Sequence, residues 1–99
     1  MAKYLLSNRA VNDLADIWNY TYDTWSEKQA DKYYTLLIDS CQLLADGKVK
    51  GKKYQEVMMD LSGLKVGQHI LFYRKSTGDT IEVARILHSS MDLKSKMEE

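Results

Sequence analysis

The stretch between Leu64 and His88 constrains the fold more than any other part of this chain. Residues 64–75 and 80–88 are two runs rich in β-branched and aromatic side chains, separated by the turn-forming sequence Ser76-Thr77-Gly78-Asp79. Two such runs joined by a short loop that contains glycine are typical of a β-hairpin. The sequence therefore predicts a small antiparallel sheet, which the earlier part of the chain has to cover.

Alternation along the two runs predicts which side chains share a face of this sheet. In the second run, one face carries Ile81, Val83, Arg85 and Leu87. In the first run, Ile70, Phe72 and Arg74 oppose His69, Leu71 and Tyr73. Because neither face is purely polar, we expect helices on one face and a partly apolar groove on the other. The groove would be rimmed by Arg74, Arg85, His69 and His88, each of which also fits an ordinary strand residue with a solvated head.

Two amphipathic helices precede the sheet. Apolar residues recur every three or four positions from Val11 to Trp25, and Ser7 stands where the N-cap of this helix belongs. The sequence Ser26-Glu27-Lys28-Gln29 fits a capping box, so a second helix begins at Ser26, and Gly47 closes it. Since almost nothing separates the helices, they should form an antiparallel hairpin whose remaining aromatic and aliphatic side chains suit a binding partner.

The remaining segments complete the expected architecture. Residues 3–6 can add a strand, residues 48–62 read as a basic loop, and the charged tail can form a helical turn capped by Asp92. The fold class is therefore α+β with the order β-α-α-β-β-β, an N-terminal strand and a helical hairpin packed on a small antiparallel sheet. At 99 residues, we expect one domain that spans 1–99.

Composition excludes several classes of protein. No apolar run approaches the roughly 20 residues of a membrane-spanning helix, and the apolar stretch near the N-terminus is too short for a signal peptide. The single cysteine, Cys41, agrees with a reducing compartment, so we expect a cytoplasmic protein. Two distant histidines without a cysteine partner offer no metal-ligand spacing, and glycine-rich phosphate loops are absent. We therefore expect no metal and no cofactor.

The residues themselves leave one catalytic function open. Metal-independent RNA cleavage needs a base and several fixed cations, which Lys65, Arg74, Arg85 and His88 can supply. Alternation, however, distributes these basic groups over both faces of the sheet.

Four segments closely resemble ParE toxins of the RelE/ParE superfamily. They are YLLSNRAVNDLADIWNYT at 4–21, Trp25 with QADKY at 29–33, GLKVGQHILFYR at 63–74 and IEVARILHSSMD at 81–92. The resemblance covers nearly the whole chain, and the segments stand in the family's order.

This resemblance implies the toxin of a bacterial type II toxin–antitoxin pair. A ParD-like antitoxin would hold it inactive in a hetero-oligomer, its C-terminal segment lying along the helical hairpin and the sheet edge. ParE toxins inhibit DNA gyrase by binding and are not enzymes, so direct binding of nucleic acid is not expected unless the chain is a ribonuclease. The expected target contacts are Arg74, Arg85, His88, Met91 and Asp92. The expected antitoxin contacts are Trp18, Tyr22, Tyr33 and Leu37.

The RelE branch of the superfamily implies a different activity, the ribosome-dependent endonucleolytic cleavage of mRNA. In that case Lys65, Arg85 and His88 would carry charge stabilisation and proton transfer. The chain lacks the C-terminal tyrosine that often ends the basic set of that branch, which favours gyrase inhibition.

Overall fold

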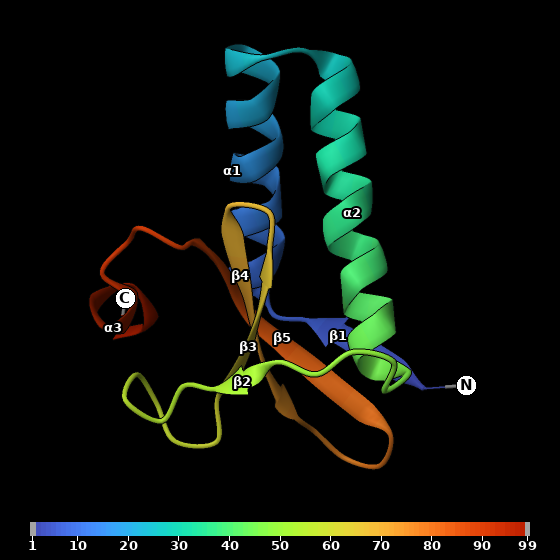
Figure 1. Ribbon diagram of the computed structural model, residues 1–99, viewed down its shortest axis with the longest axis vertical. Coiled ribbons are helices and arrows are strands. Elements are labelled where there is room, and N and C mark those ends of the chain that lie inside the picture. The colour runs from blue at the N-terminus through green and yellow to red at the C-terminus, as the bar shows by residue number, and fades with distance from the viewer. Residues whose placement is uncertain (1, 99) are drawn as a thin grey trace.

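The computed structural model describes residues 2–98, apart from the side chains of Lys94 and Glu98. The elements in chain order are β1 (Lys3–Leu6), α1 (Asn8–Thr24), α2 (Glu27–Ala45), β2 (Lys52–Lys53), β3 (Ser62–Val66), β4 (His69–Lys75), β5 (Thr80–His88) and α3 (Leu93–Glu98). Figure 1 shows α1 and α2 as a long antiparallel hairpin whose far end projects beyond the sheet, while α3 lies well away from that end.

The strands form one five-stranded sheet in the order β1-β5-β4-β3-β2. The predicted hairpin is confirmed, since β4 pairs antiparallel with β5 and β3 pairs antiparallel with β4. The sheet is mixed, however, because β1 pairs parallel with β5 and so departs from the antiparallel sheet that we expected. Alternation of side chains carries no information about strand direction, and the long helical connection after β1 permits a parallel pairing.

Strand β5 contains an irregularity that alternation did not predict. Tyr73 pairs with Val83 and Phe72 pairs with Arg85, so Ala84 is an extra residue in β5. An extra residue of this kind is a β-bulge, which breaks the two-residue period of the strand. The side chains before Ala84 and those after it therefore follow different alternations.

The bulge corrects the predicted faces of β5. Ile86, rather than Arg85 or Leu87, joins Ile81 and Val83 in the core beneath the helices. Leu87 packs in a second core on the opposite side of the sheet. The predicted grouping of Arg85 and Leu87 with Ile81 and Val83 is wrong for this reason. In β4 the prediction is confirmed, with Leu71 in the helix-side core and with Ile70 and Phe72 in the second core.

Both helices begin where capping chemistry predicted. The Ser7 hydroxyl accepts the backbone N–H of Ala10, and the Ser26 hydroxyl accepts that of Gln29. The helices bury one stripe against the sheet, made of Ala10, Leu14, Leu37, Cys41 and Leu44. The hairpin therefore forms the cover that the sheet requires. No helix of the described residues is long and apolar enough to cross a membrane.

The second face of the sheet is not the open groove that we predicted. The segment after β2 and the helix α3 cover much of it, and Tyr54, Leu61 and Met97 pack there on Phe72 and its neighbours. The four predicted rim residues are also divided. Arg74 and Arg85 line a pocket on this side, whereas His69 contacts Tyr33 of α2 and His88 contacts His69 on the helix side.

Core packing of α2 can be tested with two adjacent leucines. Leu37 is completely buried, whereas Leu36 is 46% exposed on the same helix. We expect Leu37→Ala to lower the free energy of unfolding by about 2–5 kcal/mol through lost burial and a cavity. Leu36→Ala should lower it by less than about 1 kcal/mol. Urea denaturation of both variants measures the difference, and equal losses would contradict the assignment of Leu37 to the core.

Candidate interaction sites

Beyond the end of β1, side chains rather than a strand cover the edge of β5. The pairing of β1 with β5 ends at Leu6 and Val83. The next carbonyl, that of Ala84, accepts the Ser7 hydroxyl at 2.6 Å. The Asp13 carboxylate accepts the backbone N–H of Ile86 at 2.9 Å. The polar backbone of the bulge is thereby satisfied by the start of α1.

The same carboxylate forms an ion pair with Arg85. Nε and Nη2 of Arg85 donate to the two oxygens of Asp13 at 2.8 and 3.0 Å, which is a bidentate arrangement. Nη1 donates to the backbone carbonyl of Lys96 at 2.8 Å. Both side chains of the pair are about nine-tenths buried, at 11% and 12% exposed. Arg85 therefore links β5 to α1 and to α3.

Tyr33 joins α2 to the turn between β3 and β4. Its hydroxyl accepts the backbone N–H of Gln68 at 3.0 Å and lies 2.7 Å from Nδ1 of His69. It also donates to the carbonyl of Val66, at 3.2 Å. Gly67 in this turn has φ +58°, and a Cβ there would stand 2.7 Å from the Tyr33 ring. The turn thus needs glycine both for its backbone and for close contact with α2.

Burial sets the protonation state of this cluster. It lowers the pKa of His69 from the ordinary 6.5 to about 4, with His88 adding to the decrease and Asp13 opposing it. Burial also raises the pKa of the Tyr33 hydroxyl. His69 is therefore neutral at pH 7 and serves as a hydrogen-bonding partner rather than a cation.

His88 ends β5 beside the same cluster. Its ring lies edge-on to that of His69, with centroids 5.3 Å apart. Nδ1 of His88 accepts the backbone N–H of Ser90 at 3.1 Å and lies 2.7 Å from the Ser90 hydroxyl. His88 thereby closes the turn that follows β5.

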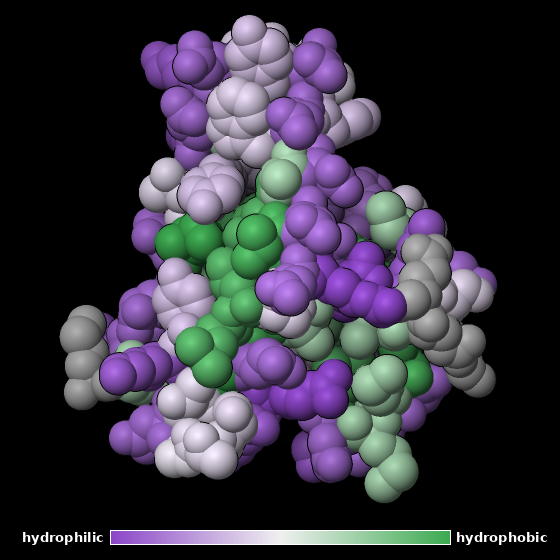
Figure 2. Space-filling view, turned by 180° about the vertical axis from the view of Figure 1, so that it is seen from behind, coloured by the Kyte–Doolittle hydropathy of each residue, from purple (hydrophilic) through white to green (hydrophobic). Residues whose placement is uncertain are grey.

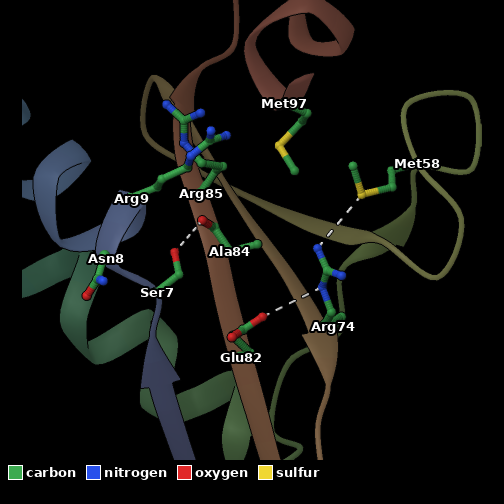
Figure 3. Close-up of a pocket in the computed structure, with 9 residues that line it drawn as sticks. All are labelled: Ser7, Asn8, Arg9, Met58, Arg74, Glu82, Ala84, Arg85 and Met97. Atoms are coloured by element: carbon green, nitrogen blue, oxygen red, sulfur yellow. Dashed lines mark hydrogen bonds and ion pairs between the residues drawn. The ribbon is translucent and has the colours of Figure 1, made fainter. Parts of the chain in front are cut away.

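An open pocket of about 260 Å³ lies on the opposite side of the sheet, and we call it the arginine pocket (Figure 3). It is lined by Ser7, Asn8, Arg9, Met58, Arg74, Glu82, Ala84, Arg85 and Met97. In Figure 3 the residues from the start of α1 lie on one side and the two methionines on another. Arg74 forms a loose ion pair with Glu82, Nε to Oε1 at 3.8 Å.

The helical hairpin carries a surface of a different kind. Trp18 and Tyr22 stack with ring centroids 5.2 Å apart, and the Trp18 indole donates to Asp31 at 3.0 Å. Near the projecting end, Tyr20 and Trp25 are 69% and 73% exposed. Figure 2 shows apolar side chains gathered in a band on the face seen there, with pale side chains of intermediate hydropathy above it. Exposed aromatic and aliphatic area of this extent is typical of a protein-binding surface.

Comparison with known proteins assigns the chain to a family. The family model of the ParE toxin of type II toxin–antitoxin systems, parDE, matches residues 4–93. Toxin ParE1 of Mycobacterium tuberculosis (strain ATCC 25618 / H37Rv) is 37% identical over 92 residues, which are 93% of this chain and 94% of that protein. Toxin ParE1 of Caulobacter vibrioides is 32% identical over 97 residues, which are 98% of this chain and 99% of that protein.

The chain belongs to the ParE toxin family of type II toxin–antitoxin systems. Its fold agrees with that of a solved structure described as the chromosomal ParDE TA system from P. aeruginosa, with a TM-score of 0.73. That likeness covers 89% of this chain and 95% of the other at 16% sequence identity, so it is a likeness of fold. The α+β prediction is confirmed.

The residues predicted as target contacts of this ParE toxin are dispersed. Arg74 lines the arginine pocket, Arg85 is held in its ion pair, and His88 lies on the helix side of the sheet. Met91 is 42% exposed in the segment that leads to α3. Asp92 caps α3, as predicted, because its carboxylate accepts the N–H and the hydroxyl of Ser95.

The residues predicted as antitoxin contacts fall into two groups. Trp18 is partly exposed and Tyr22 is 49% exposed, so the ParE hairpin displays both. Leu37 is completely buried, and the Tyr33 hydroxyl is engaged with the turn after β3. A partner that meets the intact fold therefore does not reach Leu37. Tyr20 and Trp25 are more exposed than either displayed residue, and our sequence analysis missed them as binding candidates.

Asp13 is the structural residue that the sequence analysis missed. A signal was present, because Asp13 stands one turn from Ala10 and from Ile17 on the apolar stripe of α1. A carboxylate on such a stripe requires a buried partner.

Among the described residues, no three His, Cys, Asp or Glu side chains are grouped to hold a metal ion. Cys41 is buried, and burial raises the pKa of its thiol to about 11, so it is not a reactive thiolate.

The Asp13–Arg85 pair should contribute strongly to stability. We expect Asp13→Ala to lower the free energy of unfolding by about 3–5 kcal/mol, because it leaves a buried guanidinium without its carboxylate. Asp16→Ala, which removes an exposed carboxylate from the same helix, is the matched control and should cost less than about 1 kcal/mol. Urea denaturation provides both values, and a small loss for Asp13→Ala would show that the pair is dispensable.

The low pKa of His69 predicts a pH dependence. Between the unfolded value near 6.5 and the folded value of about 4, the unfolded chain binds more protons than the folded chain. Stability contributed by neutral His69 is therefore complete above pH 6.5 and is lost as the pH falls toward 4. We expect His69→Gln to flatten the decline in unfolding free energy between pH 6.5 and 5. An unchanged slope would assign the decline to other groups.

Proposed function

We propose that this ParE-family toxin inhibits DNA gyrase by binding it, and that a ParD-like antitoxin neutralises the toxin by covering its binding surfaces. Family membership supports an antitoxin partner, and the proposed target is a cytoplasmic enzyme. One observation favours inhibition by binding over RNA cleavage. The side chains of Lys65, Arg85 and His88, which a nuclease would need to bring together, are separated in the structure.

That separation is pronounced. Lys65 is exposed and pairs with Ile70, whose side chain belongs to the second core of the sheet. His88 pairs with His69 and therefore lies on the opposite, helix-covered face. Arg85 donates to Asp13 and to the Lys96 carbonyl. A base and cations that stabilise one phosphate have to converge on the same few ångströms, and these three side chains do not.

The hairpin supports the antitoxin part of the proposal. Trp18, Tyr22 and Trp25 present stacked or exposed aromatic rings, which are frequent anchors in protein–protein interfaces. An amphipathic segment of a partner can lay its apolar face on such a surface. The first 46 residues also carry seven acidic and four basic side chains, so a segment with basic flanks fits best.

The deciding experiment is a supercoiling assay with purified gyrase, plasmid and this protein. We expect lost supercoiling and trapped linear DNA, both relieved by the antitoxin encoded beside the toxin gene. Unchanged gyrase activity at protein concentrations that arrest growth would overturn the proposal and direct attention to ribosome-bound mRNA.

His88→Gln separates the two activities further. A nuclease that uses His88 as acid or base should lose about 10²–10⁴-fold in rate. Loss of one side chain from a binding surface should weaken gyrase inhibition by less than about tenfold. The measurement is the toxin concentration that gives half-maximal loss of supercoiling. The control is Gln68→Ala, which changes an exposed residue in the turn between β3 and β4.

A further inference from the structure

The arginine pocket contains a guanidinium, that of Arg74, whose side chain is 41% exposed but whose inner nitrogen is paired only loosely by the described residues. Nε of Arg74 is buried and has no hydrogen-bond partner in the structure. Its nearest carboxylate oxygen, Oε1 of Glu82, lies 3.8 Å away, beyond hydrogen-bond distance. Its Nη2 reaches only the Met58 sulfur, at 3.8 Å, which is a weak acceptor. A buried donor without a hydrogen-bond partner is energetically unfavourable, so an acceptor that reached it would stabilise the structure.

A second arginine faces the same space. Arg9, from the first turn of α1, lines the pocket, and neither of the ion pairs Arg74–Glu82 and Arg85–Asp13 includes it. Arg9 therefore has no carboxylate of this part of the chain within ion-pair distance. Among the lining residues that the structure describes, Glu82 is the one carboxylate. Besides Arg85, which is paired with Asp13, the described lining thus holds two guanidiniums and one carboxylate, so these lining residues carry a net positive charge.

Apolar side chains form the rest of the wall. Met97 is 7% exposed and Ala84 is 8% exposed, and Met58 is partly buried beside the second core (Figure 3). Methionine side chains adapt their shape to whatever packs on them. The pocket therefore combines cationic side chains with apolar, adaptable ones.

We propose that the arginine pocket binds a carboxylate side chain from an acidic segment of the antitoxin, with an adjacent apolar side chain packed on Met58 and Met97. Naming the antitoxin as the source rests on the proposed function. The carboxylate accepts from Arg74 while Arg9 adds positive charge to the pocket, and charge-assisted bonds of this kind are among the stronger ones in proteins. Occupation of the pocket also covers Arg74, one of the predicted target contacts.

The composition of the pocket favours a peptide carboxylate over a nucleic-acid phosphate. A phosphodiester brings a sugar and further phosphates with it, and these would meet the methionine wall and the Glu82 carboxylate. Proteins that bind a nucleic-acid backbone extend their positive charge along a groove. Here the charge is confined to a small pocket whose wall is partly apolar, which suits a single acid next to an apolar residue.

The test uses the full chain labelled with ¹⁵N-arginine and two small probes, acetyl-Glu-Leu-amide and the neutral acetyl-Gln-Leu-amide. Titration is followed through the Nε–Hε signal of Arg74. We expect a saturable shift with the acidic probe and binding at least about tenfold weaker with the neutral probe. Equal responses to the two probes would overturn the proposal. Inorganic phosphate that binds as tightly as the acidic probe would also overturn it, in favour of a phosphate site.

Two variants with matched controls sharpen the result. Glu82→Gln removes the competing acid and should tighten the acidic probe by about threefold or more. Asp79→Asn makes the same charge change in the exposed β4–β5 turn and should leave affinity unchanged. Arg9→Gln should weaken binding of the acidic probe by about threefold or more, whereas Lys28→Gln, at an exposed position of α2, should not. Equal effects of a variant and its control would reduce the site to general electrostatics and overturn it.

The outcome is independent of the gyrase assay. A toxin that traps gyrase but fails to bind the acidic probe overturns the pocket proposal alone. A chain that binds the probe as expected but leaves gyrase unaffected overturns the proposed function and, with it, the naming of the antitoxin as the source of the carboxylate. The pocket itself then stands as a carboxylate-binding site.

Discussion

The buried pair of Asp13 and Arg85 is the interaction on which the arrangement of this molecule depends. It joins residues 72 positions apart and connects the first helix, the last strand and the C-terminal helix. The carboxylate also satisfies the backbone of β5 just after the bulge. A bulge at the edge of a sheet leaves polar backbone groups unpaired, so the irregular strand and the ion pair depend on one another. At this point of β5, α1 supplies the acceptor that the neighbouring strand does not.

This coupling explains which parts of the molecule the sequence predicts. The helical hairpin, its serine caps and the β4–β5 hairpin follow from interactions between residues a few positions apart, and all of them are confirmed. The parallel pairing of β1 and the extra residue at Ala84 depend on contacts between distant segments. Alternation cannot reveal either of them, because it assumes an unbroken strand and is blind to direction.

The candidate interaction sites also divide into features that follow from residues close in the sequence and features that depend on contacts between distant segments. Trp18 and Tyr22 could be placed on the outside of the hairpin from their helical spacing, and the structure displays both. Arg85 and His88 lie only three residues apart in β5 but end on different sides of the sheet. Leu37 shares its helix with exposed neighbours and yet is completely buried. Spacing identifies a stripe, but the width of the stripe that the core covers depends on how the helices pack.

The two outer strands of the sheet carry a consequence for how the toxin behaves on its own. β1 has four residues and begins with Lys3, and β2 consists of Lys52 and Lys53 alone. Short edge strands that carry lysine resist pairing with a strand from another molecule. Copies of the toxin therefore have little tendency to join through their backbones. Its exposed aromatic and aliphatic side chains lie mostly on the helical hairpin, and a surface made of side chains selects what binds it by shape and charge rather than by an exposed row of amides.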